Sequence, residues 1–222
     1  MDDLLSFDGP LKSHLRTKYT EYFAYLVLKR CYSEHYDDLL LDDAPDLQMP
    51  DKSVGIEVTV AVSKQTAQID GEFTNYRVGK QGAEAKERCK QIIEHNGGKI
   101  DPLGLTYPVQ TLKGEQAIFR AAIQNKMKKL ASYRRKGFAQ VGLFMLYEEM
   151  PLPPGNVQRD WLQMFDDAQE GYGDKYDFLY FCYPDALLTY HFSTGSYHVD
   201  VIGREGYGEL SKAARLAVER ER

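Results

Sequence analysis

The sequence has few cysteines and no long hydrophobic run. Of its 222 residues only Cys31, Cys89 and Cys182 are cysteines, and they lie far apart in the chain. Isolated cysteines argue against a disulfide framework and against a structural zinc site, and they are typical of a reducing compartment, so we expect a cytoplasmic protein. No stretch is long enough to form a membrane-spanning helix, so we expect no membrane partner.

Several catalytic motifs are also absent. The five histidines show no metal-ligand spacing, and neither HExxH nor the GxSxG nucleophile elbow occurs. Residues 79–82 resemble a phosphate-binding loop only superficially, because they lack its spacing and its Lys-Ser/Thr end. These absences leave the carboxylates as the best candidates for chemistry.

Charge is unevenly distributed. The net charge of −5 argues against a generic nucleic-acid binder. However, residues 1–57 carry twelve acidic and six basic side chains, whereas residues 115–136 carry seven basic side chains and one acidic. An acidic, metal-binding region beside a basic helix suits a phosphate-bearing substrate. A solvated basic helix face is the alternative interpretation.

The order of elements predicts a mixed α/β domain with helices packed on a central sheet. We interpret residues 1–222 as a single domain with an insertion at 66–114, which can set specificity or oligomerisation, for example as a homodimer. The expected helices are 11–32, 81–95, 115–134, 161–168 and 209–222. The expected strands are 38–42, 54–62, 140–147, 177–183, 187–192 and 197–202.

The strand expected at 54–62 carries the first candidate site. Its even-numbered positions from Ile56 to Val62 are apolar, and its opposite face carries Glu57 as a single carboxylate between small residues. Asp46 follows Pro45 eleven residues upstream of Glu57. Two carboxylates at adjacent strand ends can hold a hard cation such as Mg²⁺ and leave positions for substrate.

Other interpretations of these carboxylates stay open. Asp46 can simply cap the turn after Pro45, and Glu57 can be a solvent-facing residue of a one-sided sheet. Three nearby aspartates compete with Asp46 for the metal role: Asp42, Asp43 and Asp51. Glu21, in the expected first helix, either needs a charged partner or lies partly exposed on the helix flank.

Lys126 is the most unexpected residue of the helix at 115–134. On a helical wheel of about 100° per residue, it falls in the centre of an apolar arc that includes Ile118 and Leu130. Lys129 lies at the edge of that arc, and Lys128 points away. Lys126 must therefore either meet a carboxylate or extend its long side chain out to solvent.

Glu21, Pro45-Asp46, Glu57-Val58-Thr59 and Lys126 together resemble the PD-(D/E)xK nuclease superfamily. The resemblance spans about residues 12–150. It implies a restriction-endonuclease-like core, ordered helix, three strands, helix, strand, with a central mixed sheet flanked by helices.

The resemblance also implies roles for individual residues. It makes Asp46 and Glu57 ligands of Mg²⁺ or Mn²⁺, with Glu21 bound directly or through water. The sequence departs from the family motif at Thr59, which stands at the lysine position. Divergent members supply this lysine from elsewhere, often the following helix, so Lys126 is the natural substitute, with Lys129 second and Lys64 third.

We therefore expect a metal-dependent phosphodiesterase that cleaves nucleic acid, with DNA as the favoured substrate. Lys126 would orient the attacking water or offset charge in the transition state. The residues expected to contact the substrate backbone are Lys129, Arg134, Arg135 and Lys136. The alternatives are a catalytically inactive member of the fold that binds nucleic acid or protein, and a hydrolase of small phosphorylated substrates.

Overall fold

The structure, a computed structural model, describes residue 11 and residues 13–78, 82–101, 104–108 and 111–220. Its helices are η1 (Ser13–Leu15), α1 (Arg16–Cys31), α2 (Lys64–Val78), α3 (Ala83–His95), α4 (Leu112–Arg135), α5 (Gly155–Ala168) and α6 (Arg204–Arg220). Its strands are β1 (Leu40–Leu41), β2 (Leu47–Gln48), β3 (Val54–Val60), β4 (Lys99–Asp101), β5 (Gly104–Thr106), β6 (Gln140–Leu146), β7 (Phe178–Cys182), β8 (Ala186–His191) and β9 (Ser196–Val201).

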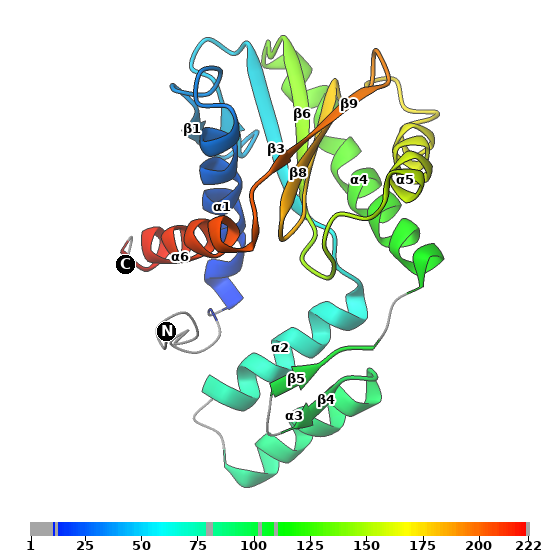
Figure 1. Cartoon of the computed structure of the whole chain (residues 1–222). Coiled ribbons are helices and arrows are strands. Elements are labelled where there is room, and N and C mark those ends of the chain that lie inside the picture. Colours follow the sequence, from blue (N-terminus) through cyan, green and yellow to red (C-terminus); the bar gives the residue numbers. More distant parts are fainter. Residues whose placement is uncertain (1–10, 12, 79–81, 102–103, 109–110, 221–222) are drawn as a thin grey trace. The chain divides into compact units, whose positions relative to one another are not determined.

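The chain divides into two compact units. The larger comprises Thr17–Ala61 and Lys113–Arg222, and the smaller comprises Met1–Arg16 and Val62–Leu112. The larger unit contains a seven-stranded sheet in the order β1-β2-β3-β6-β7-β8-β9. Strands β3, β6 and β7 are parallel, and the flanking strands are antiparallel. The molecule is thus α/β with a mixed central sheet (Figure 1).

Helices cover both faces of this sheet. On one face, buried side chains of α4 and α5, such as Phe119 and Trp161, pack with sheet residues such as Leu143. On the other face, α1 and α6 contribute Phe23 and Leu210 to a second core. Ile56 and Val58 of β3 belong to this second core, and Glu57 between them points to the opposite face, because successive side chains of a strand point to opposite faces. Burial on both faces fixes the register of β3, and hence which side of the sheet Glu57 occupies.

The smaller unit contains η1, α2, α3 and the β4–β5 hairpin. Its buried residues include Ile69 of α2 and Ile93 of α3. Both approach Gly98, where an added Cβ would lie 2.9 Å from the Ile93 side chain. Lys64, the third candidate for the missing lysine, begins α2 and so belongs to this unit.

Most of the expected elements exist with shifted ends. The helix expected at 115–134 is α4, and the one expected at 161–168 begins earlier, at Gly155. The helix expected at 209–222 begins at Arg204, and its last two residues lie outside the described part of the chain. Residue 12, in the helix expected at 11–32, and residues 79–81 lie outside it as well. Sequence reasoning missed α2, β2 and the β4–β5 hairpin, because very short strands and a helix with little amphipathic pattern give weak signals.

The first helix, α1, is buried on one side only. Its central segment, residues 22–28, consists of apolar and tyrosine side chains. In the structure α1 buries only one stripe, which includes Phe23, Val27 and Leu28, while Tyr22 and Tyr25 are half-buried. Tyrosine tolerates such positions because its ring packs while its hydroxyl reaches polar groups.

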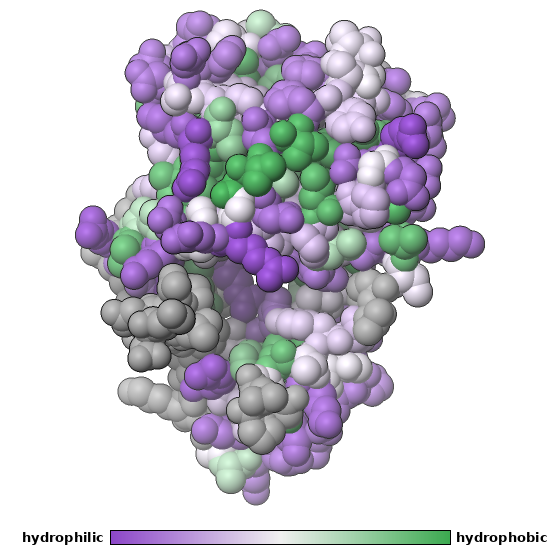
Figure 2. Space-filling model, viewed as in Figure 1, coloured by the Kyte–Doolittle hydropathy of each residue, from purple (hydrophilic) through white to green (hydrophobic). Residues whose placement is uncertain are grey.

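Hydrophilic side chains cover most of the visible face of the larger unit, and hydrophobic ones gather in a patch on it (Figure 2). The outer strand β9 exposes apolar side chains, with Val201 85% and Tyr197 41% exposed. Among the described residues, no helix combines the length and apolar character needed to cross a membrane.

Candidate active site

Asp46 and Glu57 occupy facing positions on neighbouring segments of the larger unit. Strand β2 pairs with β3 so that Leu47 lies opposite Ile56. Extending this antiparallel register by one residue places Asp46 opposite Glu57, and facing residues of an antiparallel pair point to the same side of the sheet. The two carboxylates, eleven residues apart in sequence, therefore belong to one site.

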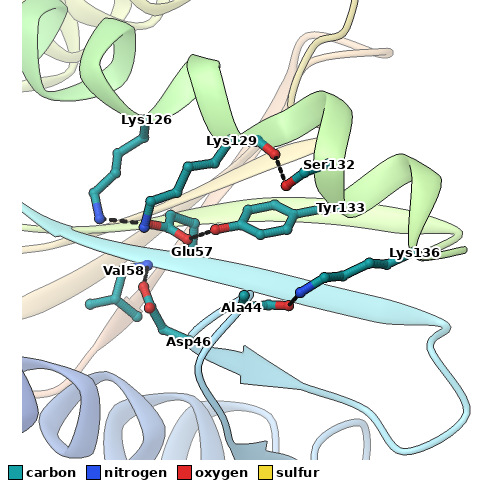
Figure 3. Close-up of polar contacts among 9 residues, drawn as sticks. All are labelled: Ala44, Asp46, Glu57, Val58, Lys126, Lys129, Ser132, Tyr133 and Lys136. Atoms are coloured by element: carbon teal, nitrogen blue, oxygen red, sulfur yellow. Dashed lines mark hydrogen bonds and ion pairs between the residues drawn. The ribbon is translucent and has the colours of Figure 1, made fainter.

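Close packing and a backbone hydrogen bond hold Asp46. Its Oδ2 accepts the Val58 N–H at 2.7 Å (Figure 3). The ring of the preceding Pro45 lies against Gly55, where an added Cβ would be 2.5 Å from Pro45 Cγ. From the other side, Lys136 Nζ donates to the Ala44 carbonyl at 2.9 Å. The segment that carries Asp46 is thus fixed against β3 and against the end of α4.

Glu57 is fully buried and accepts hydrogen bonds on both carboxylate oxygens. Its Oε1 accepts from Lys126 Nζ at 2.5 Å and from Lys129 Nζ at 2.7 Å. Its Oε2 accepts from the hydroxyl of Tyr133. A buried carboxylate is stable only when it is paired and hydrogen-bonded, and Glu57 satisfies both conditions. Glu57 is therefore an interior group of the protein and does not face solvent on a one-sided sheet.

The three donors lie on one face of α4. Their spacing of three and four residues brings Lys126, Lys129 and Tyr133 onto successive turns of the same helix face. Lys126 is the inward lysine that the helical wheel indicated, and it meets a carboxylate rather than extending into solvent. Figure 3 shows the three side chains converging on Glu57 from α4.

The charges of this cluster shift its ionisation. Burial by itself would raise the pKa of Glu57, but the hydrogen bonds from Lys126, Lys129 and Tyr133 outweigh it and lower the pKa below its ordinary value. Burial by itself would lower the pKa of Lys129, but the hydrogen bond to Glu57 outweighs burial and raises this pKa above its ordinary value. Glu57 is therefore ionised, and Lys129 is held as an ammonium.

Asp46 and Glu21 shift in the opposite direction. Burial and then the charge of Glu57 raise the pKa of Asp46, although the Val58 N–H partly offsets the shift. Burial and the charge of Asp46 raise the pKa of Glu21 to about 7. Lys126 also acts electrostatically on Glu21. Glu21 is thus close enough to interact electrostatically with Asp46 and Lys126. Its role as a metal ligand stays a prediction.

Two tyrosines belong to this neighbourhood and were missed by sequence reasoning. Neither Tyr133 nor Tyr176 was among the candidate site residues that the sequence predicted. Tyr176 is buried, and the charges of Glu57 and Asp46, after burial itself, raise its pKa. Its hydroxyl has no hydrogen-bond partner among the described residues. No sequence signal separates such a tyrosine from an ordinary core residue.

The basic residues at the end of α4 differ in their surroundings. Arg134 pairs with Asp177 at 2.7 Å and donates to the carbonyls of Ala139 and Lys175. Its guanidinium therefore ties α4 to the strands that follow. Lys136 anchors Ala44, as described above, and Arg135 is exposed. Of the residues expected to contact a phosphate backbone, Lys129, Arg134 and Lys136 already have partners within the described fold, and Arg135 is the least engaged.

The two carboxylates supply the type of ligand that a hard divalent cation prefers, but only two of them are available. Asp46 and Glu57 are oxygen donors of the type that Mg²⁺ and Mn²⁺ prefer, and Oδ1 of Asp46 accepts no hydrogen bond within the described ranges. The described part of the chain contains no group of three or more Asp, Glu, His or Cys side chains arranged to hold a metal. A cation here would therefore rely on two carboxylates, with water and substrate oxygens completing its shell, as is common for Mg²⁺.

No protein-family model matches the chain, and comparisons with curated proteins and with solved structures also found no match.

Proposed function

We propose that the protein is a metal-dependent phosphodiesterase of the PD-(D/E)xK type that cleaves nucleic acid, with DNA as the favoured substrate. The observation that carries this proposal is the convergence of Asp46, Glu57 and Lys126 from three separate segments. Lysine is absent from the motif position at Thr59, and an ammonium from α4 lies beside the motif carboxylate instead. This arrangement is what a displaced catalytic lysine requires.

The order of elements supports the same proposal. The larger unit runs through α1, β1, β2 and β3, then after the smaller unit through α4 to β6, which pairs parallel to β3. This succession is the helix, three strands, helix, strand order that the resemblance implies. The candidate residues fall on its α1, on the turn before β2, on β3 and on α4.

The chain's own residues would then act as follows. Asp46 and Glu57 would hold Mg²⁺ or Mn²⁺, and Glu21 would contribute through water, since the described residues form no group of three carboxylates around one ion. The bound ion would polarise the scissile phosphate and lower the pKa of the attacking water. Lys126 would orient that water and offset developing negative charge, since its ammonium is already fixed beside the carboxylates. Arg135 would contact the phosphate backbone without reading sequence.

The deciding experiment is Mg²⁺- or Mn²⁺-dependent cleavage of linear, circular and single-stranded DNA. Wild type should cleave at least one of these substrates, and Glu57→Gln, which keeps the side-chain shape, should not. A matched control is Glu170→Gln, because Glu170 is an exposed glutamate after α5. Cleavage that survives in Glu57→Gln would remove the active site from this position.

A second candidate function is a catalytically inactive member of the same fold that binds nucleic acid. Thr59 and the complete pairing of Glu57 with lysines favour it, because the pairing satisfies the carboxylate without any metal. Such a protein would bind DNA with a salt dependence set by its phosphate contacts, divalent ions would weaken binding only as added salt does, and the DNA would stay intact.

A further inference from the structure

The two lysines of α4 meet Glu57 at the same atom. Lys126 Nζ lies 2.5 Å and Lys129 Nζ 2.7 Å from Oε1. An ionised carboxylate offers about two lone-pair positions on each oxygen, so these ammonium groups use those of Oε1. Tyr133 donates to Oε2. Glu57 is fully buried, and both lone-pair positions of its Oε1 are occupied by ammonium groups.

A divalent cation cannot simply be added to this arrangement. It would share Oε1 with two ammonium groups, and like charges repel strongly at such short range in a partly buried site. One ammonium must leave before Glu57 can act as a ligand. The exchange would keep the carboxylate neutralised, because one positive group replaces another.

The two lysines differ in how easily they can leave. The Lys129 side chain is 49% exposed, whereas the Lys126 side chain is 23% exposed. Lys129 also lies at the edge of the apolar arc of α4, so its long stem can turn toward water and keep its ammonium hydrated. Lys126 lies in the centre of that arc and has no comparable route to solvent.

From this geometry we infer that Lys129 occupies the cation position of Glu57, and that Mg²⁺ or Mn²⁺ binds by displacing the Lys129 ammonium while Lys126 stays. Lys129 is then an internal competitor that lowers metal affinity. The buried Tyr133 hydroxyl occupies Oε2, so the inference places the competition on Oε1. The inference rests on the proposed function, because it assumes that Glu57 is a metal ligand.

The test is calorimetric titration of Mn²⁺ into the metal-stripped full chain without nucleic acid. Lys129→Met should bind Mn²⁺ about tenfold more tightly than wild type, since it removes one charge-assisted competitor. Lys126→Met should gain less. The matched control is Lys128→Met, which removes the same charge from an exposed position of the same helix and should bind as wild type does. Glu57→Gln should lose the binding, which places the ion at Glu57.

The outcomes separate the two proposals. Unchanged or weaker affinity in Lys129→Met, beside clear binding by wild type, overturns the exchange and leaves the metal site standing. A larger gain in Lys126→Met, or an equal gain in Lys128→Met, also overturns the role of Lys129. Absence of Mn²⁺ binding in every variant overturns the metal site and the exchange together. Thermal unfolding with and without Mn²⁺ gives a second readout, because a ligand that binds the folded state raises the melting temperature.

Discussion

The ammonium of Lys126 lies 2.5 Å from Oε1 of Glu57, although the two residues are 69 positions apart in the chain. This contact links α4 to β3 in the larger unit. It also places a positive charge where the strand itself, with Thr59, supplies none.

Replacing Lys126 should separate activity from folding. In Lys126→Met we expect cleavage to slow at least about 100-fold, because the group that offsets transition-state charge is lost. Folding should survive, since Lys129 and Tyr133 still satisfy Glu57. Single-turnover cleavage and chemical denaturation measure the two effects. Normal cleavage by Lys126→Met would pass the catalytic role to Lys129 or Lys64.

Removing both lysines should destabilise the protein far more than the two single changes together suggest. In Lys126→Met/Lys129→Met the buried Glu57 would keep only Tyr133 as a donor, and an unpaired buried charge costs about 3 kcal/mol or more. A double-mutant cycle of unfolding free energies measures this coupling. Additive effects would show that Glu57 is better solvated than its burial indicates. Adding Glu57→Gln to the double variant should restore most of the lost stability.

Two buried tyrosines form a matched pair for testing hydroxyl contributions. Tyr133→Phe removes the donor to Glu57 Oε2 and should lower the free energy of unfolding by about 1–2 kcal/mol. Tyr183→Phe removes a buried hydroxyl that has no partner among the described residues, so stability should stay unchanged or increase. Urea denaturation of both variants is the measurement. Equal losses in the two variants would mean that the bond to Glu57 contributes nothing specific.

Stability should fall as pH rises toward neutrality because of Glu21. Its pKa is about 7 in the folded protein, raised from 4.5 by burial and by Asp46. Between these values the folded state binds more protons than the unfolded state, so the free energy of unfolding decreases with pH across this window. The raised pKa of Asp46 acts in the same sense, whereas the lowered pKa of Glu57 contributes stability that is lost only as pH falls below about 4.5.

Glu21→Gln isolates this effect. The variant should be more stable than wild type at pH 8 by about 1 kcal/mol, since solvent screens part of the penalty at a half-buried position. Its stability should also vary less between pH 5 and pH 8. Chemical denaturation over that range is the measurement, with Glu34→Gln, in the exposed turn after α1, as the control. A slope equal to that of wild type would show that Glu21 does not titrate in this window.

Asp46→Asn should lose metal affinity while keeping the fold. The amide can still accept the Val58 N–H through its oxygen, so the turn before β2 should remain in place. Replacing a charged ligand by a neutral one should weaken Mn²⁺ binding by at least about tenfold, because hard cations favour carboxylates. Asp43→Asn tests the competing assignment by the same titration. A greater loss in Asp43→Asn than in Asp46→Asn would move the metal site to Asp43.

The local elements were largely determined by the sequence. Alternation of apolar residues specifies β3, and the apolar arc around Ile123 and Leu130 specifies α4, because both patterns reflect which side chains must leave water. The same patterns placed Glu57 on the strand face opposite Ile56 and marked Lys126 as an inward lysine. That inward position left two outcomes open, a carboxylate partner or extension of the side chain to solvent, and the sequence did not choose between them.

Only the tertiary structure decided which groups meet. The register of β2 against β3 sets Asp46 opposite Glu57, and the packing of α4 on the sheet brings Lys129 and Tyr133 to the same carboxylate. It also paired Arg134 with Asp177, which its basic neighbourhood in the sequence did not suggest. Such contacts join residues far apart in the chain, and their identity depends on how whole elements pack. A local pattern gives the face on which a residue lies, but the partner on that face is supplied by another segment of the fold.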